Sequence, residues 1–389
     1  MIAVLAGLAV FALAGPFVLY PAALWLRARA SGVSPDTAGA ADPAPGVSLI
    51  ICAHDEERTI GAKIENALAL DHPRDRLEIC VASDGSTDRT VEIARRYEGQ
   101  GVRVLDLPRN GKAHALAAAV EATTAPVLAF SDANSLWRPD ALRALVRPFA
   151  DETVGGVAGD QRYDDGAGSE AFGERSYWSF DRLLKQWQSR AGTVVSATGA
   201  IYAVRRELFE PPPPDATDDF MVSTGVVARG RRLVFAPEAV AVEPPAAAAG
   251  GEFRRKVRIV TRGLRAVGYR RALLDPFRTG SYAVVLFVHK LWRRLTFVPL
   301  AVLLLLAPAC WSAGGPLALL AAGVVGATAI GALGLAVPSL GRFKPFALAG
   351  YVLMVNAACA VATFDVLRGH RVSSWEPERA SERVSGPVS

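Results

Sequence analysis

The sequence has few cysteines, little net charge and no zinc-ligand pattern. Its cysteines are Cys52, Cys80, Cys310 and Cys359; each lies in an apolar run, and none forms a C-x-x-C pair. Neither a disulfide framework nor a zinc site is indicated, so we expect these thiols to be buried as small apolar groups. The net charge is +5, from 43 Lys and Arg against 38 Asp and Glu, without a dense basic block. We therefore expect no nucleic-acid partner.

Hydrophobic residues make up 51% of the chain and are concentrated near its two ends. This excludes a disordered or fibrous protein. An uncharged run at the start can span a hydrocarbon core of about 30 Å. No basic region precedes it, and Arg27 and Arg29 stand where a signal-peptide cleavage site would be. We interpret 1–26 as a retained transmembrane anchor, and the positive-inside bias predicts a cytoplasmic domain after it, at the cell inner membrane.

The rest of the chain is predicted to alternate between soluble and membrane-associated segments. Residues 27–46 are rich in Ala, Gly, Pro and Ser and predict a linker. In 251–294 many Arg and Lys alternate with aliphatic residues, which is typical of helices lying on anionic membrane lipids. Three apolar stretches in 295–367 predict three more spanning helices, for about four in total, and 368–389 form a tail.

The segment 47–250 is predicted to be a soluble α/β domain. Its apolar runs of strand length are separated by helix-like stretches: VSLIICA (47–53), LEICVAS (77–83), VRVLDL (102–107) and APVLAFSD (125–132). This alternation predicts a parallel sheet covered on both faces. Ligands of such sheets bind beyond the carboxyl ends of the strands, so the polar residues after each run are the first candidates for a site.

Acidic residues follow the first two predicted strands. Asp55 and Glu57 come after the first, and Asp84 ends the second as part of Ser-Asp-Gly-Ser-Thr-Asp. Carboxylates at adjacent strand ends can accept hydrogen bonds from a nucleobase and a ribose. The alternative is that Asp84 belongs to a turn and Asp88 caps a helix.

Two further motifs can bind the charged part of a nucleotide. A glycine-permitted turn at Arg109-Asn110-Gly111 precedes Lys112, which brings this lysine near a diphosphate without forming a Walker A loop. The fourth predicted strand ends in Asp132-Ala133-Asn134, where two oxygen-bearing side chains at i and i+2 can hold a divalent cation. Taken alone, this is also a common turn sequence.

A last candidate is Thr217-Asp218-Asp219, which precedes an apolar, helix-like stretch. A carboxylate at a helix start can act as a general base that takes a proton from an attacking hydroxyl. Helix capping by Thr217 or Asp218 is the alternative.

Taken together and in order, these motifs resemble the family 2 inverting glycosyltransferases. They are the acidic loop after the first strand, S-D-G-S-T-D, R-N-G-K, F-S-D-A-N, G-A-I-Y-A-V-R-R, T-D-D, and R-R-K-V-R-I before membrane helices. The layout is similar to the membrane-embedded branch related to cellulose, hyaluronan and poly-N-acetylglucosamine synthases. The resemblance implies a GT-A-like nucleotide-binding domain with a mixed, mostly parallel sheet.

The resemblance also implies a role for individual residues. Asp219 would be the catalytic base, and Asp132 and Asn134 would hold Mg²⁺ or Mn²⁺. The nucleotide would be bound by Asp55, Glu57, Asp84, Lys112 and Asp132. The acceptor or a phosphate would be contacted by Gly199, Tyr202, Arg255 and Arg258.

The expected activity is transfer of a sugar from a nucleotide diphosphate sugar, by resemblance UDP-linked, to a glycan or lipid-linked acceptor. Asn134 replaces the second aspartate of the family's D-x-D motif, and Ile259 stands where the synthases have a tryptophan that stacks on the polymer. Chain synthesis and single transfer therefore both stay open. The alternative function is a non-catalytic membrane scaffold that retains the fold. A transporter is disfavoured because no predicted span has a central charge.

Overall fold

The computed structural model describes residues 1–31, 44–163, 169–243, 252–337 and 339–369, and along 169–178 the backbone alone. The chain divides into two compact units. The sheet unit includes 28–165 and 185–247, and the helical unit includes 1–27, 166–184 and 248–372. The segment 166–184, which lies inside the stretch predicted as one soluble domain, thus groups with the helical unit.

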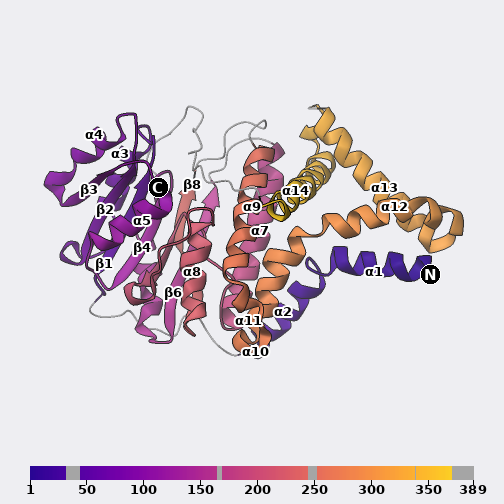
Figure 1. Ribbon diagram of the computed structural model, residues 1–389, viewed down its shortest axis with the longest axis horizontal. Coiled ribbons are helices and arrows are strands. Elements are labelled where there is room, and N and C mark those ends of the chain that lie inside the picture. The colour runs from indigo at the N-terminus through magenta and orange to yellow at the C-terminus, as the bar shows by residue number, and fades with distance from the viewer. Residues whose placement is uncertain (32–43, 164–168, 244–251, 338, 370–389) are drawn as a thin grey trace. The chain divides into compact units, whose positions relative to one another are not determined.

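The sheet unit contains a mixed sheet whose strands lie in the order β3-β2-β1-β4-β7-β6-β8-β5 (Figure 1). The strands β3, β2, β1 and β4 run parallel, β7 is antiparallel to both β4 and β6, β8 is parallel to β6, and β5 is antiparallel to β8. Their bounds are β1 Val47–Ala53, β2 Leu77–Asp84, β3 Val102–Leu107, β4 Val127–Asp132, β5 Leu136–Trp137, β6 Val154–Tyr163, β7 Tyr202–Arg205 and β8 Arg232–Glu243. The predicted mixed, mostly parallel sheet is confirmed.

Every residue of β1 is buried, because helices cover both faces of the parallel half of the sheet. Leu49 and Ile51 enter one core cluster, and Ile50 and Cys52 enter the other, as the two-residue period of a strand requires. The helices of the sheet unit are α3 Ile60–Leu68, α4 Thr90–Arg95, α5 Lys112–Glu121, α6 Ala141–Val146 and α8 Asp218–Ala228, while α7 Ser169–Arg190 runs through both units. The four cysteines are free and buried, as predicted.

The helical unit is built from apolar helices and one basic helix. Its helices are α1 Ile2–Ala14, α2 Leu19–Ala30, α9 Glu252–Tyr269, α10 Pro276–Thr279, α11 Ser281–Leu286, α12 Phe297–Ala313, α13 Gly315–Ala336 and α14 Lys344–Leu367. Among the described residues, α13 and α14 are each long and apolar enough to cross a membrane. Two bent helix pairs raise that number to four if each pair forms one span.

The predicted N-terminal anchor is not one continuous helix. Between α1 and α2 the axis bends by 52°. The break begins at Gly15, where a Cβ would come within 2.7 Å of the Trp292 ring, and Pro16 follows, which lacks the N–H that a continuing helix uses. A pair of bent segments therefore replaces the straight helix that the uncharged run predicted.

Small residues set the spacing of the helices in the helical unit. A Cβ on Gly334 would lie 2.5 Å from the carbonyl oxygen of Phe346, and one on Gly331 would lie 2.8 Å from that of Ala349. The backbones of α13 and α14 therefore approach closely, as small residues permit in membrane helix pairs. On the other side of α14, Cys359 and Ala362 pack against Val260 of α9.

Arg206, which follows β7, joins two segments of the sheet unit. Its guanidinium donates to the backbone oxygens of Ala125 at 2.6 Å and Val120 at 2.8 Å. It also donates to the hydroxyls of Ser48 and Thr123, both at 3.1 Å. Arg206, the last residue of the G-A-I-Y-A-V-R-R motif, is thus part of the scaffold.

We expect Arg206→Met to lower the free energy of unfolding by about 2 kcal/mol, because it leaves several acceptors without their charged donor. Thermal unfolding of the full chain in detergent measures this as a fall in Tm. Arg103→Met, at an exposed position of β3, is the matched control and should leave Tm nearly unchanged. Equal Tm values for the two variants would contradict the assignment.

Candidate active site

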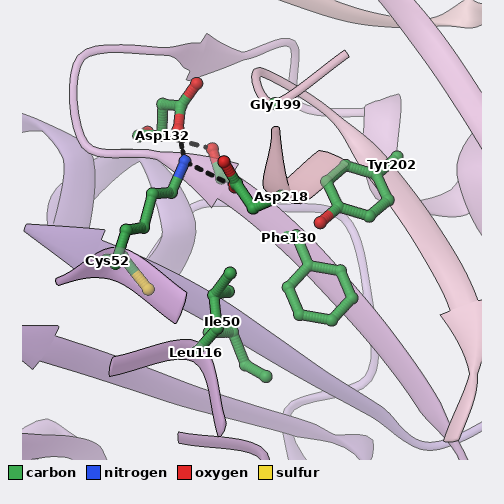
Figure 2. A pocket seen from close by; sticks show the side chains of 10 residues that line it. Ile50, Cys52, Leu116, Phe130, Asp132, Gly199, Tyr202 and Asp218 are labelled. Atoms are coloured by element: carbon green, nitrogen blue, oxygen red, sulfur yellow. Dashed lines mark hydrogen bonds and ion pairs between the residues drawn. The ribbon is translucent and has the colours of Figure 1, made fainter. Parts of the chain in front are cut away.

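The candidate site lies at the carboxyl edge of β1, β2 and β4. Lys112, the first residue of α5, reaches this edge, and its Nζ lies 2.7 Å from Oδ1 of Asp132 and 2.9 Å from Oδ2 of Asp218. The dashed lines in Figure 2 mark these two ion pairs. Burial alone would lower the pKa of Lys112, but the two carboxylates raise it well above its usual range. The lysine is therefore charged and links two acidic segments of the site.

Asp84, at the end of β2, positions the loop that leads to Lys112. Its Oδ1 accepts hydrogen bonds from the backbone N–H groups of Asn110 and Gly111, both at 2.8 Å. Gly111 has φ +90°, a conformation that favours glycine. The turn predicted before Lys112 is therefore present, and Asp84 fixes it. Its other oxygen, Oδ2, is buried and has no hydrogen-bond partner among the described residues, so it can accept an N–H from a ligand.

The loop after β1 is fixed by the loop after β2. Asp55 has φ +52°, and its Oδ1 accepts from the backbone N–H of Thr87 at 2.6 Å. Partial burial would raise the pKa of Asp55, but the hydrogen bonds from Thr87 and the neighbouring His54 lower it. The predicted residue Glu57 is 41% exposed and pairs with Arg89 at 3.8 Å. Asp55 thus fixes the loop, and Glu57 lies toward solvent.

Glu56 is a residue of this loop that the sequence interpretation missed. Burial, together with the charges of Asp132, Asp88 and Asp55, raises its pKa to about 7, against the opposing hydrogen bond from Thr59. Oε2 of Glu56 accepts a hydrogen bond from the Thr59 hydroxyl at 2.6 Å. The available signal was its position in Asp55-Glu56-Glu57, but three successive acidic residues do not show which one turns inward.

Asp218 and Asp219 form the first turn of α8, where the helix dipole favours negative charge. Oδ1 of Asp219 accepts the backbone N–H of Phe220 at 2.7 Å, which orients the carboxylate. Thr217 occupies the N-cap position without a side-chain capping bond, so the alternative of capping by Thr217 is wrong. The ion pair of Asp218 with Lys112 was not predicted, because it joins segments far apart in the sequence.

The predicted acceptor contacts Gly199 and Tyr202 both line the pocket beside Asp132 and Asp218. Tyr202 is 1% exposed and stacks on Phe130 with ring centroids 4.8 Å apart, and its hydroxyl has no hydrogen-bond partner among the described residues; its contact with an acceptor stays a prediction. Its ring lies beside Phe130 and its hydroxyl on the side of Asp218 (Figure 2). Gly199 adjoins Asp132, since a Cβ there would lie 2.7 Å from Oδ2 of that residue. Gly199 therefore leaves room for the Asp132 carboxylate.

The predicted phosphate clamp, Arg255 and Arg258, belongs to α9 of the helical unit. Arg255 Nε donates to Glu252 Oε2 of the same helix at 2.8 Å. Burial would raise the pKa of Glu252, but the charges and hydrogen bonds of Arg255 and Lys256 lower it. The clamp stays a prediction.

Asp132 and Asn134 fit a cation site that is completed by a ligand. Together they offer one carboxylate and one amide, both oxygen donors of the kind that Mg²⁺ and Mn²⁺ accept. Among the described residues no group of three His, Cys, Asp or Glu is placed to hold a metal by itself. The remaining positions of a bound cation would thus be filled by diphosphate oxygens and water.

Comparison with known proteins identifies the sheet unit. Residues 48–211 match the family model described as "Glycosyl transferase family 2", and this segment belongs to that family. The domain is that of a family 2 glycosyltransferase with a GT-A fold, as the resemblance implied. The mannosyltransferase PcManGT from Pyrobaculum calidifontis, solved with GDP-Man and Mn²⁺, has a TM-score of 0.70 and 26% identity over 93% of this chain and 99% of that one.

Curated relatives match over shorter segments. The poly-beta-1,6-N-acetyl-D-glucosamine synthase of Staphylococcus aureus is 26% identical over 209 residues, 51% of this chain and 50% of that protein. The beta-monoglucosyldiacylglycerol synthase of Synechocystis is 32% identical over 120 residues, 30% of this chain and 25% of that protein. The chain thus spans half or less of the length of these relatives.

We expect Glu56→Gln to make stability less dependent on pH. Raising the pKa from 4.5 to about 7 means that the folded protein favours the protonated carboxyl, so wild-type stability falls as the pH rises through this window. The variant should have the wild-type Tm at about pH 4.5 and a higher Tm at about pH 8, measured with EDTA present. Glu57→Gln, at an exposed site, is the control. A constant Tm difference for Glu56→Gln at all pH values would contradict this interpretation.

We expect Gly199→Ala to weaken binding of nucleotide and Mn²⁺ by about tenfold, because the added methyl group displaces the Asp132 carboxylate. Isothermal titration of the full chain measures this. Gly99→Ala is the control, since a Cβ at Gly99 meets nothing within 4 Å. Unchanged affinity in Gly199→Ala would show that the position of Asp132 does not matter for binding.

Proposed function

We propose that this protein is a membrane-bound, multi-pass inverting glycosyltransferase that transfers a sugar from a nucleotide diphosphate sugar to a glycan or lipid-linked acceptor. The observation that carries the proposal is the meeting of Asp84, Lys112, Asp132 and Asp218 at one sheet edge, with Asp219 beside them. The unpartnered Oδ2 of Asp84 fits an N–H of a nucleobase, and Lys112 fits a diphosphate.

In this proposal Asp219 takes the proton from the acceptor hydroxyl. The hydroxyl oxygen forms a bond to the sugar C1 while the bond from C1 to the diphosphate oxygen breaks, so one displacement inverts that carbon. The N–H of Phe220 holds one oxygen of Asp219 and thereby aims the carboxylate. Asp132 and Asn134 would hold Mg²⁺ or Mn²⁺, and the cation would neutralise charge on the leaving diphosphate. Lys112 would add a second positive charge beside it.

The donor nucleotide is proposed from two sources that differ. The motif resemblance favours UDP, whereas the solved relative with 26% identity was crystallised with GDP-Man. Both nucleotides therefore belong in the test.

For the acceptor, the candidate spans α13 and α14 favour a substrate at the membrane, and the basic helix α9 favours contact with anionic membrane lipids. We place the sheet unit on the cytoplasmic side of the inner membrane because Arg27 and Arg29 follow the first apolar segment.

The test is Mn²⁺- or Mg²⁺-dependent release of nucleotide diphosphate from a panel of UDP- and GDP-sugars by full-length protein in detergent with membrane lipids. Asp219→Asn should lower kcat by about 10²- to 10⁴-fold and retain nucleotide binding, because it removes the base and keeps the shape. Asp106→Asn is the control, since among the described residues the Asp106 side chain forms only an exposed ion pair with Arg95 at 3.1 Å. Nucleotide binding without turnover in the wild type would favour the scaffold alternative.

A further inference from the structure

A fully buried lysine lies beneath the loop that carries Asp132 and Asn134. Lys63 of α3 is 0% exposed. Its Nζ donates to the backbone oxygen of Ser135 at 2.6 Å and lies 4.9 Å from the centre of the Trp137 ring. Lysines are almost never fully buried unless they are paired, so this position calls for a specific reason.

The partner of Lys63, Ser135, is held through each of its polar groups. Its N–H donates to the backbone oxygen of Asp132 at 3.3 Å, and its hydroxyl donates to Glu243. Glu243 is 8% exposed and also accepts from Gln161 at 2.6 Å. A buried acid at the end of β8 and a buried base on α3 thus fix the same residue from two sides.

The helix α3 holds the same loop at a second point. The side chain of Asn66 accepts the N–H of Trp137 at 2.8 Å and donates to its carbonyl oxygen at 2.7 Å. The indole N–H of Trp137 donates to the carbonyl oxygen of Ala200 at 2.9 Å, next to the glycine that adjoins Asp132. The loop 132–137 is therefore attached to α3 by two side chains one helical turn apart.

Stability alone does not account for a charge at this place. Burial lowers the pKa of Lys63 to about 7, while Asp132 and Glu243 act in the opposite direction. Replacing buried ionic groups by apolar ones of similar size is often neutral or stabilising. Among the described residues the Lys63 ammonium is not part of such a pair: it donates to the backbone oxygen of Ser135, so what it contributes is a hold on the loop that carries Asp132 and Asn134.

We propose that Lys63, with Glu243, is a positioning residue that sets the conformation of the loop 132–135 and thereby its affinity for a divalent cation and a nucleotide diphosphate. This inference rests on the proposed function. Lys63 acts through the backbone of Ser135, and groups that orient metal ligands in this way change metal affinity by about tenfold or more when they are removed.

The test is Mn²⁺ affinity of the full-length protein in detergent, measured by electron paramagnetic resonance with UDP or GDP present. We expect Lys63→Met to raise the Kd for Mn²⁺ by about tenfold, together with a fall in Tm because the backbone oxygen of Ser135 loses its charged donor. Ile64→Ala is the matched control, because Ile64 is the next residue of α3 and is also 0% exposed. It should lower Tm and leave the Kd unchanged.

Glu243→Gln provides a second, independent variant, which decides the question if Lys63→Met does not fold. It keeps an oxygen for the Ser135 hydroxyl and removes the charge, so it should also raise the Kd. Wild-type Kd values in the folded variants would overturn the role of Lys63 and Glu243 while leaving the proposed function intact. No Mn²⁺ or nucleotide binding by the wild type would instead overturn the proposed function and this inference with it.

Discussion

The ammonium group of Lys112 sits between Asp132 and Asp218, and the arrangement of the site depends on this ion pair. The carboxylates come from the end of β4 and the start of α8, which are remote in the sequence. Both carboxylates lie beside the Lys112 ammonium group. Without this cation between them, they would repel each other in a partly dehydrated environment. Lys112 removes this repulsion, and the loop that is hydrogen-bonded to Asp84 positions the lysine.

The fold explains why so many charged groups meet at one edge. The parallel strands β1, β2 and β4 lie in register, and most of their side chains are apolar and belong to the two core clusters. The acidic residues of the site therefore come at or just after the ends of the strands. Below that edge, the same sheet buries Tyr202 and Phe130, which form an apolar floor under the carboxylates. The charged groups of the site are therefore concentrated at this edge of the sheet.

The charged groups of the sheet unit fall into an outer and an inner set. Asp132, Asp218 and Lys112 keep some exposure, as a site that admits a ligand requires. Lys63 and Glu243 are buried beneath them and make their bonds to backbone and hydroxyl groups of the loop. We expect the outer groups to bind the ligand and the inner groups to orient the loop that carries Asp132, as groups that hydrogen-bond to the ligands of a metal site do.

The sequence by itself determined the four strands β1 to β4, the edge at which the candidate site lies and the family of the domain. These follow from local patterns: an apolar run of strand length predicts a buried strand, and a carboxylate after it lies at the sheet edge. Only the tertiary structure decided that Glu56 is partly buried while Glu57 is exposed, that Lys112 pairs with Asp218, and that Tyr202 is buried. Each of these depends on a backbone angle such as the φ of Asp55, or on a contact between distant segments. A local pattern carries no information on such contacts, because they are fixed by how the elements pack.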